Sequence, residues 1–524
     1  MSPRFSLSRR AAGVLLHITS LPGPHGNGDL GPAAHRFIDF LAEAGQAWWQ
    51  VLPVNPVGLG NSPYSGVSAF SGSPLLISLE DLVEDGLLRT SDIAAELDRK
   101  RADYPAATHL RTRALRTAFA THLKAPRRLA RELDRFREES AYWLRDYTLY
   151  MALRGVQNGK SWTEWPGPLR RRETSALRRA RRELASEIAY YEFEQLLFRR
   201  QWARLREHAA ERGVGLIGDA PIFIAHESAD VWTHARLFLL DRAGQPTHVA
   251  GVPPDYFSTT GQRWGNPLYR WRTVQQLGFR WWIERFRCLL THFDVVRLDH
   301  FIGFTRFWQV PASAATAEHG RWQPAPGHAL FRALRRGLGA TPFIAEDLGE
   351  VTPAVRELRD EYALPGMRIL QFAFGGDPQA AEFLPHRYVR DCAAYTGTHD
   401  NDTFVGWFDD PGAPNAPRSP HQAAKERRAA SLYLAGPGGR ELLADVVHWE
   451  AIRTLYASVA NTAIVPLQDV LGLGNEARMN LPGSAQGNWE WRVNERALSA
   501  KLARRLSNFA QTYGRALSPR VDSG

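Results

Sequence analysis

Four carboxylates in this chain each stand directly after a short apolar run, where a buried strand would end. They are Asp219 in LIGDAP, Asp299 in VVRLDH, Glu346 in IAEDLG and Asp400 in THDND. Like charges gathered at one rim repel each other, and this raises the pKa of at least one of them. One ionised and one protonated carboxyl group are what cleavage of a glycosidic bond requires. The pattern therefore predicts glycosidic chemistry, with a third carboxylate available to hold sugar hydroxyls.

Two further side chains fit this interpretation. Arg297 precedes Asp299 by two residues on the same face of its strand, so we expect it to keep Asp299 ionised, and His399 can donate to a bound hydroxyl. A single acidic residue at a strand end is commonly a helix N-cap or an arginine partner instead. A metal site built from His300, His399, Asp299 and Asp400 is another option, but none of them has HExxH-type spacing.

The elements that must position these residues are apolar runs separated by segments with helical periodicity. Strands that alternate with helices predict a parallel sheet, and eight of them predict a closed (β/α)8 TIM barrel with functional groups at the C-terminal ends of its strands. The runs are GVLLHITS (13–20), AWWQVLPV (47–54), VGLIGDAP (214–221), FDVVRLDH (293–300), PFIAEDLG (342–349), MRILQFAF (367–374), CAAYTGTHD (392–400) and TAIVPLQDV (462–470).

Two interruptions of this alternation predict insertions. We expect residues 1–75 to form the first strands and helices of the barrel, and residues 76–205 to form a helical insertion subdomain, because such a length is too great for a structureless loop. Residues 206–510 would complete the barrel, and residues 511–524 would be a C-terminal tail. Within that last barrel part, residues 250–271 crowd Gly, Pro and aromatic residues together, which is typical of a functional loop or lid.

The composition argues against several classes of protein. The formal net charge of +10 comes almost wholly from arginine, without a recognisable nucleic-acid-binding motif, so no nucleic-acid partner is expected. The two cysteines cannot build a disulfide framework. Arg9 and Arg10 before AAGVLLHI resemble a signal peptide only faintly, and no apolar run approaches the ~20 residues that span a bilayer. We therefore expect a cytoplasmic protein without a membrane partner.

Ordered motifs along nearly the whole chain resemble one known family. They are GVLLHITSLPGPHGNGDLG, FLAEAGQAWWQVLPVNP, NSPYSGVSAFSGSPLLISLE, GDAPIFIAHESADVW, PPDYFSTTGQRWGNPLY, VVRLDHFIGF, IAEDLG, GTHDNDT and ARMNLPGS. On these motifs the chain resembles the amylomaltases, which are 4-α-glucanotransferases of the wider α-amylase superfamily. The resemblance implies a (β/α)8 barrel with helical and loop insertions and without the C-terminal β-domain of typical α-amylases. HITS in place of the more usual HPTS is one departure, and it touches none of the three carboxylates that the resemblance makes catalytic.

The resemblance assigns a role to each matching residue. It implies that Asp299 is the nucleophile, Glu346 the general acid and base, and Asp400 the stabiliser of the transition state, with Arg297 orienting Asp299. The implied substrate contacts are Asp219 and His399 on the sugar at the cleavage point, Tyr64 beside the donor sugar, Asn480 at the rim, and Tyr256, Phe257, Gln262 and Trp264 in a lid over the acceptor. Tyr64 and Trp264 are alternatively core aromatics, and Asn480 alternatively forms a turn.

The function implied is transfer of α-1,4-glucan segments to the 4-hydroxyl of another glucan by a retaining double displacement, without cofactor or metal. Expected partners are maltooligosaccharides, amylose and glucans derived from starch or glycogen, and the expected state is a monomer or weak homo-oligomer. One alternative is a retaining α-glucan hydrolase of the same superfamily. The other is a non-catalytic glucan-binding protein, which would not need Glu346.

Overall fold

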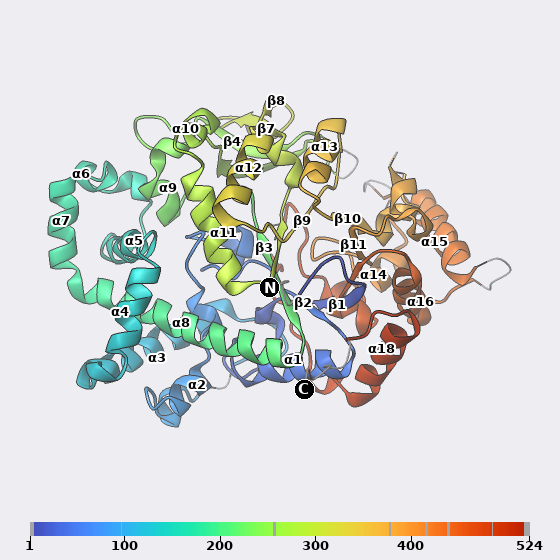
Figure 1. The fold of residues 1–524 in the computed structure, drawn as a ribbon, viewed down its shortest axis with the longest axis horizontal. Coiled ribbons are helices and arrows are strands. Elements are labelled where there is room, and N and C mark those ends of the chain that lie inside the picture. Colours follow the sequence, from blue (N-terminus) through green and yellow to red (C-terminus); the bar gives the residue numbers. More distant parts are fainter. Residues whose placement is uncertain are drawn as a thin grey trace.

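A closed barrel of eight parallel strands forms the centre of the molecule (Figure 1). The computed structural model describes residues 5–95, 97–254, 258–376, 379–413, 418–436, 441–484 and 486–517. The strand order around the barrel is β1 (Ala11–Leu15), β12 (Thr462–Pro466), β11 (Cys392–Tyr395), β10 (Gly366–Ile369), β9 (Phe343–Ala345), β6 (Val295–Leu298), β3 (Gly215–Ala220) and β2 (Trp48–Gln50). Each strand overlaps or adjoins one of the eight apolar runs, and the predicted (β/α)8 barrel is confirmed.

The barrel strands are buried on both faces. Inward side chains such as Ile217, Val295 and Ile344 pack together in one buried cluster inside the barrel. Their neighbours Leu216 and Val296 point the opposite way and join the larger core formed with the surrounding helices. This double burial explains why the strands read as continuous apolar runs rather than as alternating patterns.

Helices follow most of the strands and cover the outside of the barrel. Some of them begin at an N-cap signal in the sequence: Ser419 and Ser499 accept hydrogen bonds from backbone N–H groups of the first turns of the helices Pro420–Ala435 and Ala500–Thr512. These helices are α1 (Pro32–Glu43), α9 (Ala229–Thr233), α10 (Trp271–Gln276), α11 (Arg280–His292), α12 (Gly327–Leu338), α13 (Pro353–Glu361), α14 (Phe404–Asp409), α15 (Pro420–Ala435), α16 (Ala444–Ala457), α17 (Leu467–Val470) and α18 (Ala500–Thr512).

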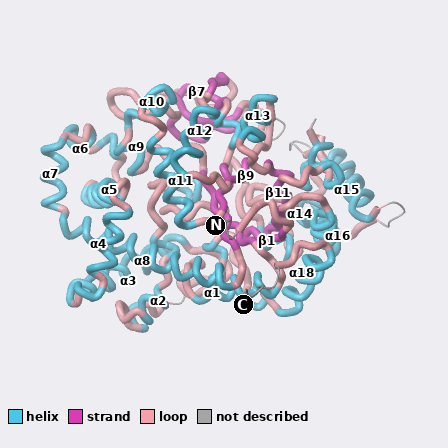
Figure 2. Tube along the Cα trace, viewed as in Figure 1, coloured by secondary structure: helices cyan, strands magenta, loops and turns pink. Residues whose placement is uncertain are grey.

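The long stretch between β2 and β3 is helical and lies to one side of the barrel (Figure 2). Its helices are α2 (Leu79–Glu84), α3 (Tyr104–Lys124), α4 (Ala130–Glu139), α5 (Leu144–Val156), α6 (Gly167–Arg170), α7 (Thr174–Glu183) and α8 (Ala185–Glu211). The 27-residue α8 contacts α3, α4 and α5 on one hand and α1 and β3 on the other, so it ties this group of helices to the barrel. The division of the chain at residues 75, 205 and 510 stays a prediction.

A second sheet departs from the sequence expectation. Residues 250–271 suggested a functional loop or lid, yet β5 (Gln262–Pro267) lies within this stretch and pairs with β4 (His248–Val252), which overlaps its start. β4 also pairs antiparallel with β7 (Arg306–Pro311), and β7 pairs with β8 (Arg321–Pro324), giving the order β5-β4-β7-β8. The pairing was missed for two reasons. Two of these four strands come from a separate part of the chain, and the local composition of the other two is rich in Gly and Pro, which is untypical of strands. After β12, the described residues contain no further strand.

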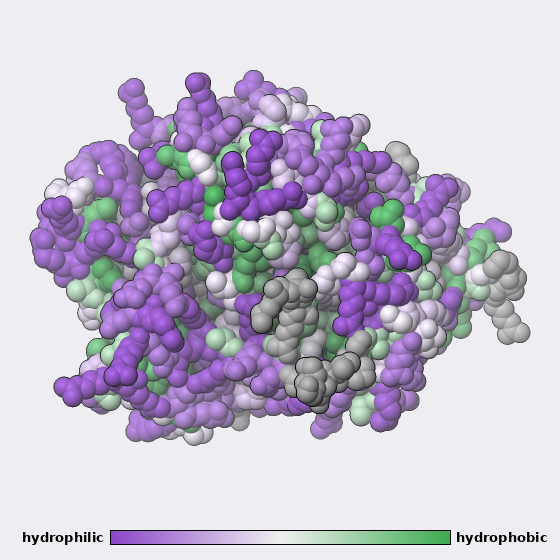
Figure 3. Space-filling model, viewed as in Figure 1, coloured by the Kyte–Doolittle hydropathy of each residue, from purple (hydrophilic) through white to green (hydrophobic). Residues whose placement is uncertain are grey.

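The face of the molecule seen in Figure 3 is predominantly polar. Figure 3 shows hydrophilic side chains over most of the face in view, including the helices α3 to α7. The largest fully buried side chains include Trp48, Trp49, Trp162, Trp232 and Trp282, so much of the tryptophan content belongs to the core. Within the described ranges, no helix has the length and apolar character needed to cross a membrane.

Candidate active site

The strand geometry directs three charged side chains toward the barrel axis. Side chains two residues apart on a strand share a face. Arg297 therefore follows Val295 on the inward face of β6, and Asp219 follows Ile217 on the inward face of β3. Asp219 and Arg297 are direct partners in the register of these two strands. Glu346 stands just beyond β9, two residues after the inward-facing Ile344.

Arg297 is the centre of the site. Its Nη1 lies 2.6 Å from Asp219 Oδ2 and 3.1 Å from Asp299 Oδ1, while its Nη2 lies 3.8 Å from Glu346 Oε2. The side chains of Arg297 and Asp219 are 5% and 0% exposed, whereas Asp299 keeps 27% of its side chain accessible. One buried cation thus faces three carboxyl groups and leaves the carboxylate of Asp299 open to a ligand.

The environment of Glu346 favours its protonated form. Burial, reinforced by the charge of Asp299, raises the pKa of Glu346 to about 8, although Arg297 and the backbone N–H of His300 oppose the rise. The His300 N–H donates to Oε2 at 2.5 Å. Since Oε2 accepts this bond and also faces Arg297, the proton is best carried on Oε1. Glu346 can therefore act as a proton donor near neutral pH.

Asp219 lies at the bottom of the site and is tied to an aromatic side chain. Burial raises the pKa of Asp219, and this rise is opposed by Arg297 and by the hydroxyl of Tyr64, which donates to Asp219 Oδ2 at 2.8 Å. The Tyr64 ring stacks on the His399 ring, with 5.1 Å between centroids and 12° between planes. Tyr64 thus connects the Arg297 cluster to the loop that carries Asp400.

Asp400 is held on both of its carboxylate oxygens. Asn480 Nδ2 donates to Oδ1 at 2.6 Å, and His399 Nε2 lies 3.3 Å from Oδ2. The backbone N–H of Asn480 also donates to the carbonyl of His399 at 3.1 Å. The side chain of Asp400 is 43% exposed, so each oxygen retains lone pairs for a sugar hydroxyl.

The predicted lid residues are only partly within the described chain. Trp264, on β5, is 37% exposed and stands edge-on to the His300 ring at 4.9 Å between centroids. Its Nε1 donates to Gln262 Oε1 at 3.1 Å. The contact with His300 connects β5 to the residue after Asp299, at the rim of the site. Tyr256 and Phe257 lie outside the described residues.

Sequence reasoning missed two residues next to the site, Trp489 and Arg478, and considered a third, His300, only as a possible metal ligand. His300 adopts a left-handed backbone conformation with φ of 51°, and this turn directs its N–H toward Glu346. Trp489 is buried, and its ring centroid lies 6.0 Å from that of Tyr64 and 5.9 Å from that of His399. Arg478 donates to the carbonyl of Asp400 at 2.6 Å. Only Arg478 carried a usable signal, since it stands two residues before Asn480 in ARMNLPG.

The metal-site alternative gains no support from the geometry. Across the residues that the structure describes, no group of three or more His, Cys, Asp and Glu side chains is arranged to hold a metal ion. The imidazole of His300 lies against the ring of Trp264.

Comparisons with known proteins agree with this geometry. A family model described as 4-alpha-glucanotransferase matches residues 16–498. A 4-alpha-glucanotransferase of Thermus thermophilus is 48% identical over 509 residues, covering 97% of this chain and 99% of the relative. A chloroplastic or amyloplastic 4-alpha-glucanotransferase of Solanum tuberosum is 41% identical over 516 residues, covering 97% of this chain and 87% of the relative.

The structural comparison leads to the same family. The amylomaltase of Streptococcus agalactiae, solved in complex with acarbose, superposes with a TM-score of 0.90 at 36% identity, covering 97% of this chain and 100% of the other. The resemblance found in the sequence motifs is confirmed, and neither the hydrolase nor the glucan-binding alternative is favoured. The chain belongs to the 4-alpha-glucanotransferase family and is an enzyme of this type.

Proposed function

We propose that Asp299, Glu346 and Asp400 carry out the transfer of α-1,4-glucan segments, with Asp299 as nucleophile, Glu346 as general acid and base, and Asp400 as stabiliser of the transition state. The observation that carries the proposal is the arrangement around Arg297. One buried guanidinium lies 3.1 Å from the accessible Asp299 and 3.8 Å from the buried Glu346. The guanidinium pairs with the carboxylate of Asp299, while burial favours the protonated form of Glu346, and a retaining mechanism uses one carboxyl group as nucleophile and one as acid.

In the first step the Asp299 carboxylate attacks the anomeric carbon of the donor glucan. The bond to the leaving oxygen breaks, and the proton of Glu346 moves to that oxygen. The product is a glycosyl ester on Asp299 of inverted configuration. In the second step Glu346, now ionised, takes the proton of the acceptor 4-hydroxyl, whose oxygen displaces Asp299 and restores the α-configuration.

The remaining residues are proposed to hold the sugar at the cleavage point. Asp400 would accept hydrogen bonds from its hydroxyls, oriented by Asn480 at 2.6 Å and by His399 at 3.3 Å. His399 would bind further hydroxyls and Tyr64 would lie beside the donor sugar. Asp219 was expected to bind hydroxyls as well, but 0% of its side chain is exposed, so it would act by fixing Arg297 and Tyr64. On the acceptor side Gln262 and Trp264 would contact the glucan together with Tyr256 and Phe257, excluding water and so favouring transfer over hydrolysis.

The proposed substrates are maltooligosaccharides, amylose and glucans from starch or glycogen. The amylomaltase of Streptococcus agalactiae was solved with acarbose bound, which supports an oligosaccharide ligand for this site. A cytoplasmic location, the monomeric or weakly oligomeric state, and the lack of nucleic-acid and membrane partners stay predictions. Light scattering of the purified protein tests the oligomeric state.

Incubation with maltotriose, without phosphate, nucleotide or metal, tests the proposal. We expect glucose together with maltopentaose and longer chains at constant total reducing ends. The Asp299→Asn and Glu346→Gln variants should lose this activity while still binding acarbose. Rising reducing ends with only shorter products would indicate a hydrolase, and wild-type turnover by either variant would remove that residue from its proposed role.

A further inference from the structure

The loop of residues 396–404 carries His399 and Asp400, and both of its ends are bound to one buried carboxylate. Asp469 lies in α17, immediately after β12, and is 1% exposed. Its Oδ2 accepts a hydrogen bond from Thr396 Oγ1 at 2.5 Å, and its Oδ1 accepts one from the backbone N–H of Phe404 at 2.7 Å. The two donors stand at the beginning and the end of the loop, so the carboxylate of Asp469 links the two ends of the loop to each other.

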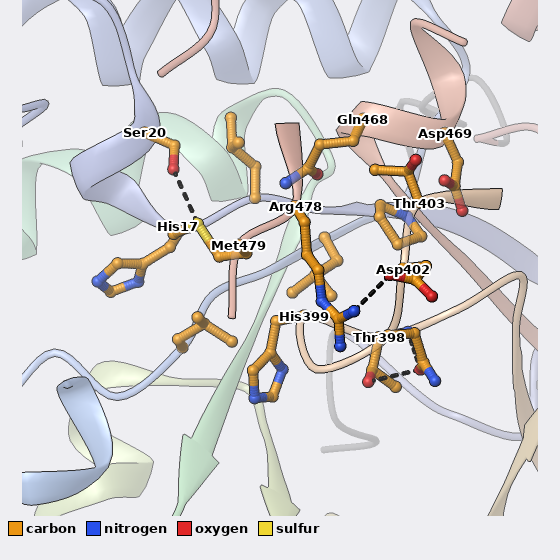
Figure 4. A pocket seen from close by; sticks show the side chains of 15 residues that line it. His17, Ser20, Thr398, His399, Asp402, Thr403, Gln468, Asp469, Arg478 and Met479 are labelled. Atoms are coloured by element: carbon orange, nitrogen blue, oxygen red, sulfur yellow. Dashed lines mark hydrogen bonds and ion pairs between the residues drawn. The ribbon is translucent and has the colours of Figure 1, made fainter. Parts of the chain in front are cut away.

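Packing alone does not hold this loop in place. A cavity of about 20 Å³, seen from close by in Figure 4, lies behind the loop. Its lining includes His17, Thr398, His399, Thr403 and Asp469. Side chains that face a void lack attractive contacts on that side. Discrete hydrogen bonds therefore act beside the ring stack of His399 on Tyr64 in holding His399 and Asp400.

Other polar contacts hold the middle of the loop, and at its beginning the backbone N–H of Gln371 donates to the carbonyl of Thr396 at 3.3 Å. Arg478 donates to the carbonyl of Asp400 at 2.6 Å and pairs with Asp402, as Figure 4 shows for the second contact. Gln371 Nε2 donates to the carbonyl of Asp402 at 2.8 Å. Neither Arg478 nor Gln371 bonds to the side chain of Thr396 or to the N–H of Phe404.

The chemical character of Asp469 fits a role in geometry rather than in charge balance. It forms no ion pair with any residue in the described ranges of the chain, although its side chain is buried. Burial raises the pKa of Asp469 to about 6, against the two hydrogen bonds that favour its ionised form. A buried carboxyl group without a cationic partner is costly, and its two directed hydrogen bonds compensate for that cost.

We infer that Asp469 is a positioning residue of the transferase reaction, which acts through Thr396 and Phe404 to hold Asp400 and His399 against the sugar at the cleavage point. The inference rests on the proposed role of Asp400. Asp469 itself lies behind the loop and touches none of the reacting groups. Its removal should therefore impair the transition state, in which Asp400 acts, more than the binding of substrate.

Three variants of the full chain test this inference by the separation of kcat from KM. Asp469→Ala removes both hydrogen bonds, and we expect kcat for maltotriose disproportionation to fall about 100-fold with KM changed less than about threefold. Thr396→Val removes one bond without changing the side-chain volume much, and should lower kcat about tenfold. Asp469→Asn can accept from the Phe404 N–H through its carbonyl and donate to Thr396 Oγ1 through its amide, so we expect kcat within about threefold of wild type.

Matched controls separate positioning from simple loss of stability. Asp81→Ala removes a buried carboxylate of α2 that is bonded to Ser78, and Thr148→Val alters a buried threonine of α5. Both controls should keep wild-type kcat per folded molecule, even where their thermal unfolding temperature falls. If Asp469→Ala does not fold, Thr396→Val and Asp469→Asn still decide the matter.

The outcomes distinguish this inference from the proposed function. Wild-type kcat in Thr396→Val would overturn the positioning role of Asp469, and so would an equal loss of kcat in Asp469→Asn and Asp469→Ala. In both cases the proposed role of Asp400 would stand as long as Asp400→Asn is inactive. Full activity of Asp400→Asn would instead overturn the proposed role of Asp400. A low kcat in Asp469→Ala that is restored in Asp469→Asn supports the positioning role.

Discussion

The protonation of Glu346 should set the alkaline limit of the reaction. Burial in the Arg297 cluster raises the pKa of Glu346 to about 8, and only its protonated form can give a proton to the leaving oxygen. As the pH rises through about 8, this form is depleted about tenfold for each further pH unit. Between pH 7 and pH 10, kcat/KM should therefore fall about 100-fold. Below pH 7 Glu346 is already protonated, so its titration does not lower kcat/KM there.

Initial rates on maltotriose well below KM, measured at half-unit steps from pH 6 to 10, give this profile directly. Samples returned from pH 10 to pH 7 must recover full activity, which separates titration from unfolding. The matched control is Glu346→Gln, whose low residual rate should lose the alkaline limb. A donor with an aryl leaving group, which needs little protonation, should also show a weaker limb in the wild-type enzyme. A flat profile to pH 10, or a limb that persists unchanged in Glu346→Gln, would refute the reasoning.

Three further substitutions probe the contacts around this group. Arg297→Lys keeps the positive charge but replaces the planar guanidinium that faces three carboxyl groups. We expect kcat to fall by about 10²–10³ while circular dichroism shows an intact fold. A near-normal kcat would contradict the central role of Arg297. Tyr64→Phe removes the 2.8 Å bond to Asp219 but keeps the stack on His399, and should cost about tenfold in kcat/KM; no loss would make that bond irrelevant to turnover. Trp264→Ala opens the acceptor rim, so the share of donor lost to water, measured as new reducing ends per transfer, should rise, and an unchanged share would argue against exclusion of water by this residue.

The barrel and the carboxylate cluster were accessible from the sequence because both follow from local pattern. Each strand is a short apolar run, and the alternation of inward and outward side chains carries Asp219 and Arg297 to the axis once the strands are placed. The closeness of Glu346 to Arg297 then follows from the neighbouring positions of β6 and β9 in the barrel. The family resemblance assigned a separate role to each of the three catalytic carboxylates, and these roles stay a proposal.

Other features could not be read from the sequence because they depend on contacts between distant segments. The β5-β4-β7-β8 sheet joins strands from two separate stretches, and β5 carries Gly265 and ends at Pro267, residues that usually argue against a strand. Asp469 looks like an ordinary residue at the start of a helix until its oxygens meet Thr396 and Phe404, which lie about 70 residues earlier in the chain. The left-handed turn at His300, which directs its N–H to Glu346, has no signature in VVRLDHFIG.

The proposed reaction depends above all on a covalent bond between the Asp299 carboxylate and the donor sugar. This bond can be tested in the Glu346→Gln variant with a maltosyl donor that carries an aryl leaving group. The first step needs no acid with such a donor, and the second step lacks its base, so the intermediate should accumulate. Mass spectrometry of the intact protein and of its peptides should then find one maltosyl group, attached at Asp299. Attachment at Asp219, Asp400 or any other side chain would contradict the proposed mechanism, as would steady turnover without any adduct.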